Sequence, residues 1–395
     1  MTSTAAAAGQ PPTGHVTFVA SHVAPTGGME RAVYEIAERM AGRGWHVTVI
    51  ARACAVTPGP NVAFHRIRSP SRPATLALPL SYVLGSRLVK RHARGAIHTV
   101  NPVIWQRAEV HQAQFCLAAY RANVGIPRRR RSWITHRINE FLATRFGLAV
   151  ERRALRSSGA HLVAPASRGL QREIEQFYPR PSETMTVVTN GVDPDRFRPD
   201  ADARARNRAA LGIADDAPVA VFVGGDWGRK NLATAIEAVG EAPDWHLLVV
   251  GRGDQPSYER LAGEHGAGDR VHFVGHVPDP EAWLAAGDAL LAPSSYEAFS
   301  LAMLEGASAG LVLLTAPING AEDLVEPDVN GWLLPIEPAA FGARLRELSG
   351  DRDRLREMGA AARRTALTYS WDRIADQFEA LYRASGAADR ADAGR

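Results

Sequence analysis

Short apolar segments that alternate with helical patterns dominate the second half of the chain and restrict its fold. Each segment has the length of a strand and ends in a turn rich in Gly, Pro or Asp. Buried strands separated by helices predict a doubly wound parallel sheet, in which ligands bind beyond the carboxyl ends of the strands. The predicted strands are Val219–Val223, His246–Val250, Val271–Val274, Ala289–Ala292 and Leu311–Thr315.

The first half repeats this alternation. His15–Ser21, Trp45–Ala51 and Ala96–Val100 are predicted strands. Met29–Arg43, between the first two, is a predicted helix that ends at Gly44, because glycine readily adopts the left-handed conformation of a helix stop. Since 395 residues exceed one typical core, the expected fold class is α/β with two doubly wound, Rossmann-like domains.

The expected junction between the domains lies at Val187–Pro199, where a short strand and a turn are followed by prolines and charges. We therefore place the first domain at residues 15–187 and the second at residues 188–370. Residues 1–14 lack a basic start followed by an apolar run, so we interpret them as a disordered tail and not as a signal peptide. Residues 386–395 are expected to form a frayed tail.

The composition indicates a cytoplasmic protein. Hydrophobic residues make up 46% and charged residues 22% of the chain, as in ordinary globular domains. Cys54 and Cys116 are too few for a disulfide framework, and their spacing matches no zinc site, so a reducing compartment is expected. No apolar stretch reaches the roughly 18–20 residues that a membrane span requires.

Charge is divided unevenly between the halves. Residues 1–187 contain 25 Lys and Arg against 9 Asp and Glu, whereas residues 188–395 contain 21 against 33. A basic half suits an anionic membrane surface or an acidic substrate. The basic segments are Ala74–Arg94 and the four arginines at 128–131, each next to apolar residues that we interpret as a core face. Peripheral association with the inner membrane face is therefore a further expectation.

Two pairs of residues suit a phosphate group. Gly27 and Gly28 precede the first predicted helix, where absent side chains let a ligand approach the backbone closely. Arg229 and Lys230 lie in the turn after the first strand of the second half, and lysine is scarce, since only Lys90 and Lys230 occur among 46 cations. A planar guanidinium beside a movable ammonium suits a diphosphate. A plain tight turn and a solvated charge pair remain the alternatives.

Two glutamates lie in the loop and helix that follow the strand at 289–292. Glu297 and Glu305 are eight residues apart, which separates them by roughly 80° in a continuous helix, so they need not act alike. A helix that begins near Phe299 or Ser300 leaves its first backbone N–H groups unpaired, and these stabilise phosphate. Compensation of the helix dipole by one acid, with the other solvated, is the alternative.

The pattern around these glutamates, ExFxLxxLExxAxG, resembles the donor-site signature of retaining glycosyltransferases of family four. Their architecture, called GT-B, has two Rossmann-like domains with a cleft between them. The resemblance spans nearly the whole chain and is strongest from about Val219 to Leu334. It implies transfer of a hexose from a nucleotide diphosphate donor, with a UDP-sugar favoured, and with retention of the anomeric configuration. The segments GGDWGRKN and WHVTV resemble members that build lipopolysaccharide cores.

For the second domain, the resemblance implies donor binding. Arg229 and Lys230 match the pair that neutralises the leaving diphosphate. Glu297 would face the hydroxyls of the donor sugar, and Glu305 would accept hydrogen bonds from the ribose. The remaining expected contacts are the strand-end glycine, the base-binding turn and the start of the helix, namely Gly224, His276, Val277, Phe299, Ser300 and Leu301.

For the first domain, the resemblance implies contacts from the acceptor side. Gly27 and Gly28 match the loop that touches the donor's diphosphate and sugar, and Glu30 matches the acid that commonly follows. His111 matches a histidine that faces the donor sugar near the reacting carbon, although a lone histidine is more often structural. The last helix, 371–385, is expected to cross back onto this domain. The implied catalytic residues are His111, Arg229, Lys230 and Glu297.

The implied partners are the nucleotide-sugar donor and an acceptor that is a glycan, a glycolipid or a small molecule. No cofactor beyond the donor cosubstrate and no metal are expected, because no carboxylate pair occupies a convincing turn. Nucleic acid is not an expected partner. Two alternatives stay open: a sugar-nucleotide epimerase of the same architecture, which would isomerise the free donor, and a nucleic-acid-binding protein, whose basic half would bind with steep salt dependence.

Overall fold

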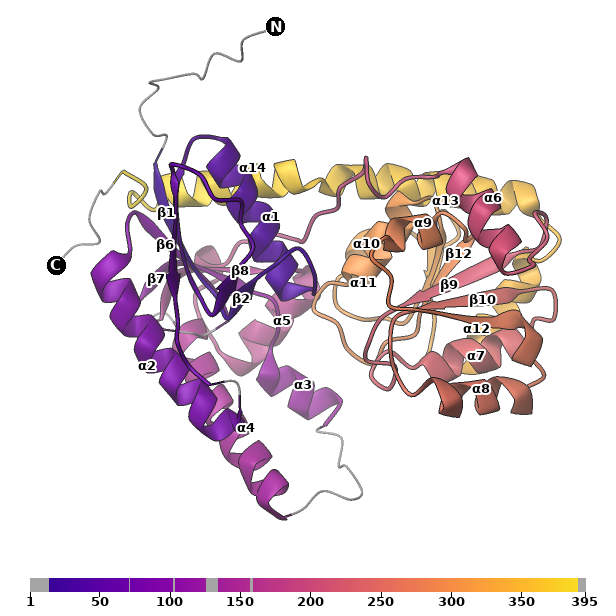
Figure 1. The fold of residues 1–395 in the computed structure, drawn as a ribbon, viewed down its shortest axis with the longest axis horizontal. Coiled ribbons are helices and arrows are strands. Elements are labelled where there is room, and N and C mark those ends of the chain that lie inside the picture. The colour runs from indigo at the N-terminus through magenta and orange to yellow at the C-terminus, as the bar shows by residue number, and fades with distance from the viewer. Residues whose placement is uncertain (1–13, 71, 102–103, 126–133, 157–158, 390–395) are drawn as a thin grey trace, which may run out of the picture.

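The computed structural model describes residues 14–70, 72–101, 104–125, 134–156 and 159–389, and only the backbone of residues 134–138. Two lobes, each a sheet covered by helices, lie side by side (Figure 1). The last helix, α14 (Trp371–Ala384), runs from the second lobe back along the first. This arrangement confirms the predicted fold class of two Rossmann-like domains.

The first lobe is built on a parallel sheet. Among the described residues, six strands pair in the order β5-β3-β1-β6-β7-β8, so the direction of chain progression reverses between β1 and β6. The register sets Val16 of β1 opposite Val47 on one side and Ala96 on the other. The strands are β1 His15–Val19, β3 His46–Ala51, β5 Val62–Arg66, β6 Ala96–Val100, β7 Ala108–Ala113 and β8 Ala160–Pro165, and a short parallel pair joins β2 His22–Val23 to β4 Ala53–Cys54.

Helices cover both faces of this sheet. The chain leaves the first helix through Gly44 at φ 82°, the left-handed conformation predicted for a helix stop. Two long helices, α2 and α4, pack against each other and extend below the sheet in Figure 1. The helices are α1 Met29–Gly42, α2 Ala74–His92, α3 Leu117–Asn123, α4 Ile134–Leu155 and α5 Arg168–Phe177, followed by a 3₁₀ turn at Ser182–Thr184.

The second lobe repeats the topology. Its described strands pair in parallel in the order β11-β10-β9-β12-β13-β14, and chain progression reverses between β9 and β12. The predicted strands at 219–223, 246–250 and 289–292 have the expected bounds. The strands are β9 Val219–Val223, β10 His246–Val250, β11 Val271–Gly275, β12 Ala289–Ala292, β13 Val312–Thr315 and β14 Gly331–Leu333.

The helices of the second lobe connect these strands and close its core. Large aromatic side chains fill the space between sheet and helices, since Phe222, Trp245 and Phe341 are fully buried. The helices are α6 Ala201–Ala210, α7 Leu232–Gly240, α8 Gln255–Glu264, α9 Pro280–Leu284, α10 Leu301–Ser308, α11 Ala321–Leu324, α12 Pro338–Leu348 and α13 Arg352–Ala366, with 3₁₀ turns at Gly268–Arg270 and Leu367–Tyr369.

Helix α14 belongs to the core of the first lobe. Trp371 and Tyr382 are fully buried there, and the Tyr382 hydroxyl contacts His98 Nδ1 of β6 at 2.5 Å. Ion pairs add to this packing, because Arg39 of α1 and Arg43, directly after α1, contact acidic side chains of α14. The end of the chain therefore completes the domain in which the chain begins.

The expected tails are shorter than predicted. Ala387 and Ala388 are buried in the first lobe, and the Ala388 carbonyl accepts a hydrogen bond from His15 N at 2.8 Å. Gly14 likewise belongs to the fold, since its carbonyl accepts from His46 N at 2.9 Å. The prediction of a frayed tail from residue 386 is therefore wrong for Ala387 and Ala388, because Ala388 is hydrogen-bonded to the first residue of β1. Residues 1–13 and 390–395 lie outside the described residues.

Candidate active site

The candidate site lies where chain progression reverses in the second sheet. Strands β9 and β12 are neighbours there, with Ala220 opposite Ala289. The loops after these strands, residues 224–231 and 293–300, are consequently adjacent, and Ser295 N donates to Arg229 O at 2.9 Å between them. Ligands of open α/β sheets bind at such positions.

A charged cluster of Arg229, Lys230 and Glu297 joins the two loops. Lys230 Nζ donates to Glu297 Oε1 at 2.9 Å, and Arg229 Nη1 lies 3.0 Å from the same oxygen. That guanidinium nitrogen also donates to the carbonyl of Tyr296 at 2.6 Å. The structure thus brings together three side chains that the sequence assigned to one site.

The cluster is electrostatically coupled. Burial alone would raise the pKa of the Glu297 carboxyl, but Lys230 and Arg229 outweigh it, so this pKa is lowered. Burial disfavours the charged form of Arg229, yet Glu297 and Asp226 more than compensate, so the pKa of Arg229 is raised. Glu297 is therefore a carboxylate at neutral pH. An anion that binds Lys230 or Arg229 competes with Glu297 for them.

Glycines keep the strand ends open beside this cluster. A Cβ atom at Gly224 would lie 2.2 Å from Lys230 Cδ, so any side chain there would displace the lysine. The neighbouring ends are tied by backbone hydrogen bonds, from Gly224 N to Val250 O at 2.9 Å and from Gly251 N to Gly275 O at 2.7 Å. The glycines therefore let the ends of β9, β10 and β11 pack closely, with these two N–H groups already paired.

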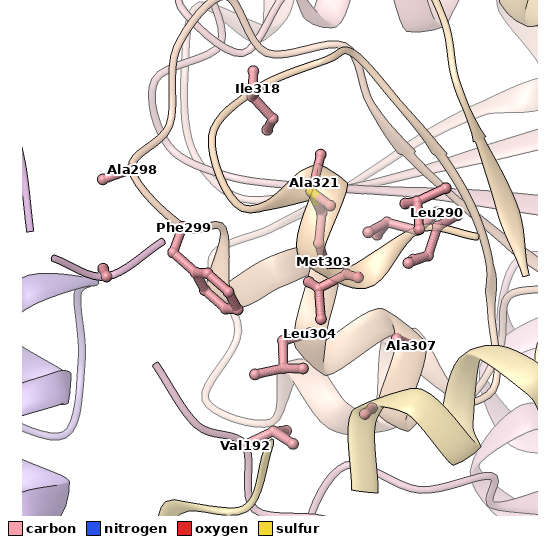
Figure 2. Close-up of a cluster of buried hydrophobic side chains, with 14 of the residues drawn as sticks. Val192, Leu290, Ala298, Phe299, Met303, Leu304, Ala307, Ile318 and Ala321 are labelled. Carbon is pink, nitrogen blue, oxygen red and sulfur yellow. The ribbon is translucent and has the colours of Figure 1, made fainter. Parts of the chain in front are cut away.

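The start of α10 is held firmly in place. Ser300 is its N-cap, and the serine hydroxyl accepts from Met303 N at 3.4 Å. Phe299 is buried beside Met303 and Leu304 (Figure 2). A Cβ atom at Gly320 would lie 2.7 Å from the Phe299 ring, so only glycine fits there. Because these side chains are engaged, α10 can offer a ligand only its first backbone N–H groups, which lack partners inside the helix.

The Glu305 carboxylate, for which the resemblance implies a contact with the ribose, is almost fully buried. Its carboxylate forms an ion pair with Arg31 of α1, and both side chains are 9% exposed. The guanidinium also lies over the ring of Phe197, 5.4 Å from its centroid. Burial raises the pKa of Glu305, and Arg31 offsets only part of this effect. The ribose contact that the resemblance implies for Glu305 stays a prediction, and such a contact would share the carboxylate with Arg31.

His111 lies inside the first sheet and not in the candidate site. Its side chain is 3% exposed, and Nδ1 contacts the hydroxyl of Thr99 on the neighbouring strand at 2.9 Å. Burial, followed by the charge of Arg180, lowers the pKa of His111 to about 4. Strand β7 continues to Ala113, so the histidine precedes the strand end. The contact of His111 with the donor sugar that the resemblance implies stays a prediction, which a side chain only 3% exposed does not support.

The glycine pair and the turn predicted to bind the base are accessible enough for backbone contacts. Gly27 and Gly28 are exposed, and Gly27 has φ 88°. A Cβ atom at Gly27 would lie 2.6 Å from Glu30 Oε2, so the carboxylate packs directly on this glycine. In the turn after β11, His276 is exposed and Val277 is half-buried.

Contacts between the lobes surround the candidate site, and sequence reasoning missed them. Ser167 Oγ at the start of α5 donates to Ala298 O at 2.7 Å, and Tyr296 OH donates to Glu173 Oε2 at 2.8 Å. Arg168 pairs with Asp323 at 2.9 Å. Arg31 could have been suspected, because it follows the glycine pair by three residues. The other contacts depend on the packing of lobes, for which a single sequence carries no signal.

Two kinds of feature, a cluster of metal-ligating side chains and a membrane-spanning helix, are absent from the part of the chain that the structure describes. No group of three His, Cys, Asp or Glu side chains there is arranged to hold a metal ion. None of the described helices combines the length and the apolar character that crossing a membrane requires.

Two family models together match most of the chain. The model of glycosyltransferase family 4 matches residues 26–196, and the model of glycosyl transferases group 1 matches residues 203–365. The D-inositol 3-phosphate glycosyltransferase of Geodermatophilus obscurus is 30% identical over 396 residues, which cover 91% of this chain and 85% of that protein. Its counterpart in Thermobispora bispora is 33% identical over 228 residues, 53% of each chain. In most of the similar relatives, the match spans about half of their length.

Solved structures share the fold. WaaG, a glycosyltransferase involved in lipopolysaccharide biosynthesis, superimposes with a TM-score of 0.78 at 22% identity, over 93% of this chain and 99% of WaaG. Anabaena Alr3699/HepE in complex with UDP-glucose superimposes with a TM-score of 0.71 at 18% identity, over 94% of this chain and 100% of that one.

Proposed function

Because the chain belongs to glycosyltransferase family 4, we propose that it is a retaining hexosyltransferase that uses a nucleoside diphosphate sugar, with a UDP-sugar favoured. The observation that carries the proposal is the cluster of Arg229, Lys230 and Glu297 at the strand ends of the second sheet. A site with two cations and a helix N-terminus suits a diphosphate. The UDP-glucose complex of HepE, a protein of the same fold, supports this choice of donor.

In the proposed reaction, the bond between the anomeric carbon and the diphosphate oxygen breaks, and its electron pair stays on the diphosphate. Arg229 and Lys230 stabilise this developing negative charge, as preorganised groups do in other transfer reactions. The acceptor oxygen bonds to the anomeric carbon on the same face, and its proton passes to the departing phosphate. No side chain of this chain is then needed as a general base.

Glu297 has two roles in this scheme. It holds Lys230 and Arg229 at the strand ends, and one carboxylate oxygen, Oε1, contacts both cations. Once the diphosphate takes over the cations, the carboxylate becomes available to the hydroxyls of the donor sugar. Glu305 and Arg31 act together, because their ion pair joins α10 to the first turn of α1, directly after the glycine pair. Their contact holds the two lobes around the donor.

No metal or cofactor is part of the proposal, since the two cations supply the charge that phosphate needs. We further propose a cytoplasmic protein that associates with the inner membrane face. Apolar residues of α2 and α4 that the sequence assigned to a core face are exposed, so that interpretation is corrected for Leu78, Val83, Phe141 and Leu142. Exposed cations accompany them on the same helices, namely Arg87, Lys90, Arg91 and Arg145. The arginines at 128–131 lie outside the described residues.

Thermal unfolding in the presence of UDP, GDP, ADP or dTDP tests the donor class. A ligand that binds only the folded protein raises its stability by mass action, so UDP is expected to raise Tm most. Incubation of the matching sugar nucleotide without acceptor then tests the epimerase alternative, which predicts an isomerised sugar nucleotide. No Tm change with any of the four nucleotides would contradict the proposal.

A further inference from the structure

A cavity lies at the strand ends of the first sheet, away from the charged cluster. Its volume is about 350 Å³, within the range of small-molecule sites. Ala20 and Ser21 after β1, Arg52 after β3 and Asn101 after β6 form its floor, and α2 and α4 form its walls. Because chain progression reverses between β1 and β6, the cavity occupies the position where open α/β sheets bind ligands.

The walls of this cavity are mainly apolar. Rings of Tyr82, Phe115 and Phe146 line it together with the side chains of Ile67 and Leu78. Tyr82 stands edge-on to Phe146, with ring centroids 6.1 Å apart. A planar or alicyclic body gains from such walls through buried area and offset ring contacts.

The polar groups in the lining are already engaged. Glu151 accepts from Leu117 N at 2.6 Å, and from Tyr178 OH at 2.6 Å, so its carboxylate caps α3 and is not free for a ligand. Arg52 donates to Ser69 O at 3.3 Å and is the single cation among the described residues of the lining. A polyanionic ligand would find one guanidinium beside one carboxylate, which is unfavourable for an inositol phosphate.

One wall of the cavity leads to the candidate active site. Met29 lines it, and this residue is the first of α1, directly after Gly28. Asn101, in a left-handed conformation with φ 59°, directs its amide at the Met29 sulfur, 3.0 Å away. Two residues beyond Met29, Arg31 contacts Glu305 of the second lobe. A ligand in the cavity therefore lies beside the loop that faces the second lobe.

We propose that this cavity holds the apolar body of the acceptor, a compact aromatic or alicyclic alcohol. The inference rests on the proposed glycosyl transfer and names its acceptor class. A sugar phosphate is disfavoured by the apolar walls and the engaged charges. This chain would then differ in its acceptor from the relatives named for D-inositol 3-phosphate.

The test measures binding of three probes: 4-methylumbelliferone, D-inositol 3-phosphate and 1-dodecanol. The variant is Leu78→Trp, which places a larger side chain at the cavity wall from a position that is 44% exposed. The matched control is Leu76→Trp, on the same helix, 57% exposed and outside the lining. The Tm of each variant shows whether it folds, and the rise in Tm with UDP shows whether its donor site is intact.

The proposal predicts that the wild-type protein binds 4-methylumbelliferone and that Leu78→Trp weakens this binding at least tenfold, whereas Leu76→Trp leaves it unchanged. Equal binding to Leu78→Trp, tighter binding of D-inositol 3-phosphate, or binding of 1-dodecanol alone would each overturn it. If UDP raises Tm but no aromatic alcohol binds, the acceptor class is wrong and the donor proposal stands. If the alcohol binds and UDP has no effect, the donor proposal fails instead.

Discussion

The two lobes share one topology but offer opposite chemistry at the same structural position. In each sheet, the first strand in the sequence lies beside the fourth, β1 beside β6 and β9 beside β12, and chain progression reverses between them. In the second lobe, two cations and a carboxylate occupy that point. In the first lobe, aromatic and aliphatic side chains surround a cavity there. The topology fixes where a ligand binds, and the loops and flanking helices decide which ligand.

This difference matches the division of labour that a transfer reaction needs. The charged side suits the diphosphate, whose negative charge increases as the bond breaks. The apolar side suits the body of an acceptor that stays neutral throughout. The Arg31–Glu305 pair connects the two points, since it bridges the first turn of α1 and the middle of α10.

The largest effect is expected at the charged side. Replacement Lys230→Ala should lower kcat about 10²–10³-fold, because it removes one preorganised group that stabilises the leaving diphosphate. Steady-state kinetics with the preferred sugar nucleotide measure this change. The chain offers a matched control in Lys90→Ala, which removes the other lysine, exposed on α2. Equal turnover in the two variants would remove Lys230 from the mechanism.

Loss of the ion pair between Arg31 and Glu305 should lower the free energy of unfolding strongly. Replacement Arg31→Met leaves Glu305 as an uncompensated buried charge, and such breaks cost about 3–5 kcal/mol. Urea unfolding followed by a double-mutant cycle with Glu305→Gln measures the coupling. The double variant should be more stable than Arg31→Met alone, because the unpaired charge is gone. Additive losses would mean that the two residues act independently.

A smaller effect distinguishes the two helix caps. Ser300→Ala and Ser370→Ala each remove a cap hydroxyl, from α10 and α14, and each should lower the free energy of unfolding by about 0.5–1 kcal/mol. Only Ser300→Ala should also weaken UDP binding, by a few-fold, since α10 presents its first N–H groups at the charged side. Calorimetric titration of UDP checks both variants. Equal UDP affinities would separate α10 from the donor.

The pH dependence of stability should differ in sign between the two glutamates. The lowered pKa of Glu297 stabilises the folded protein above the unfolded value of 4.5, and this contribution is lost as pH falls through the folded pKa. The raised pKa of Glu305 acts oppositely, so its contribution to stability decreases as pH rises from 4.5 toward the folded pKa. Comparing Glu297→Gln and Glu305→Gln by urea unfolding across this pH range tests both signs. Parallel curves for the two variants would contradict the assignment.

Local patterns predicted three strands of the first sheet, β1, β3 and β6, and five of the second, β9 to β13, but not β5, β7, β8 or β14. The members of the charged cluster were assigned through the resemblance to the family. Strand ends in a parallel sheet meet at one edge, so residues that directly follow β9 and β12 must lie close together once the strand order is known. This edge explains why Lys230 and Glu297, 67 residues apart in sequence, lie together, although their assignment to one site had rested on the resemblance.

Features that depend on packing could not be predicted in this way. A parallel strand is buried on both faces, so its sequence does not show where it ends, and His111 proved to precede the end of β7. The partner of Glu305 and the apolar cavity depend on how helices from distant segments come together. The exposure of Leu78 and Phe141 could not be predicted either, because an apolar stripe on a helix does not reveal whether another element covers it.

The most direct test of the charged cluster compares the affinities of UDP and uridine by calorimetric titration, for the wild-type protein and for the double variant Arg229→Ala/Lys230→Ala. If these cations receive the diphosphate, the wild-type protein binds UDP at least tenfold more tightly than uridine, and the double variant binds the two almost equally. A preference for UDP that survives the loss of both cations would contradict the account.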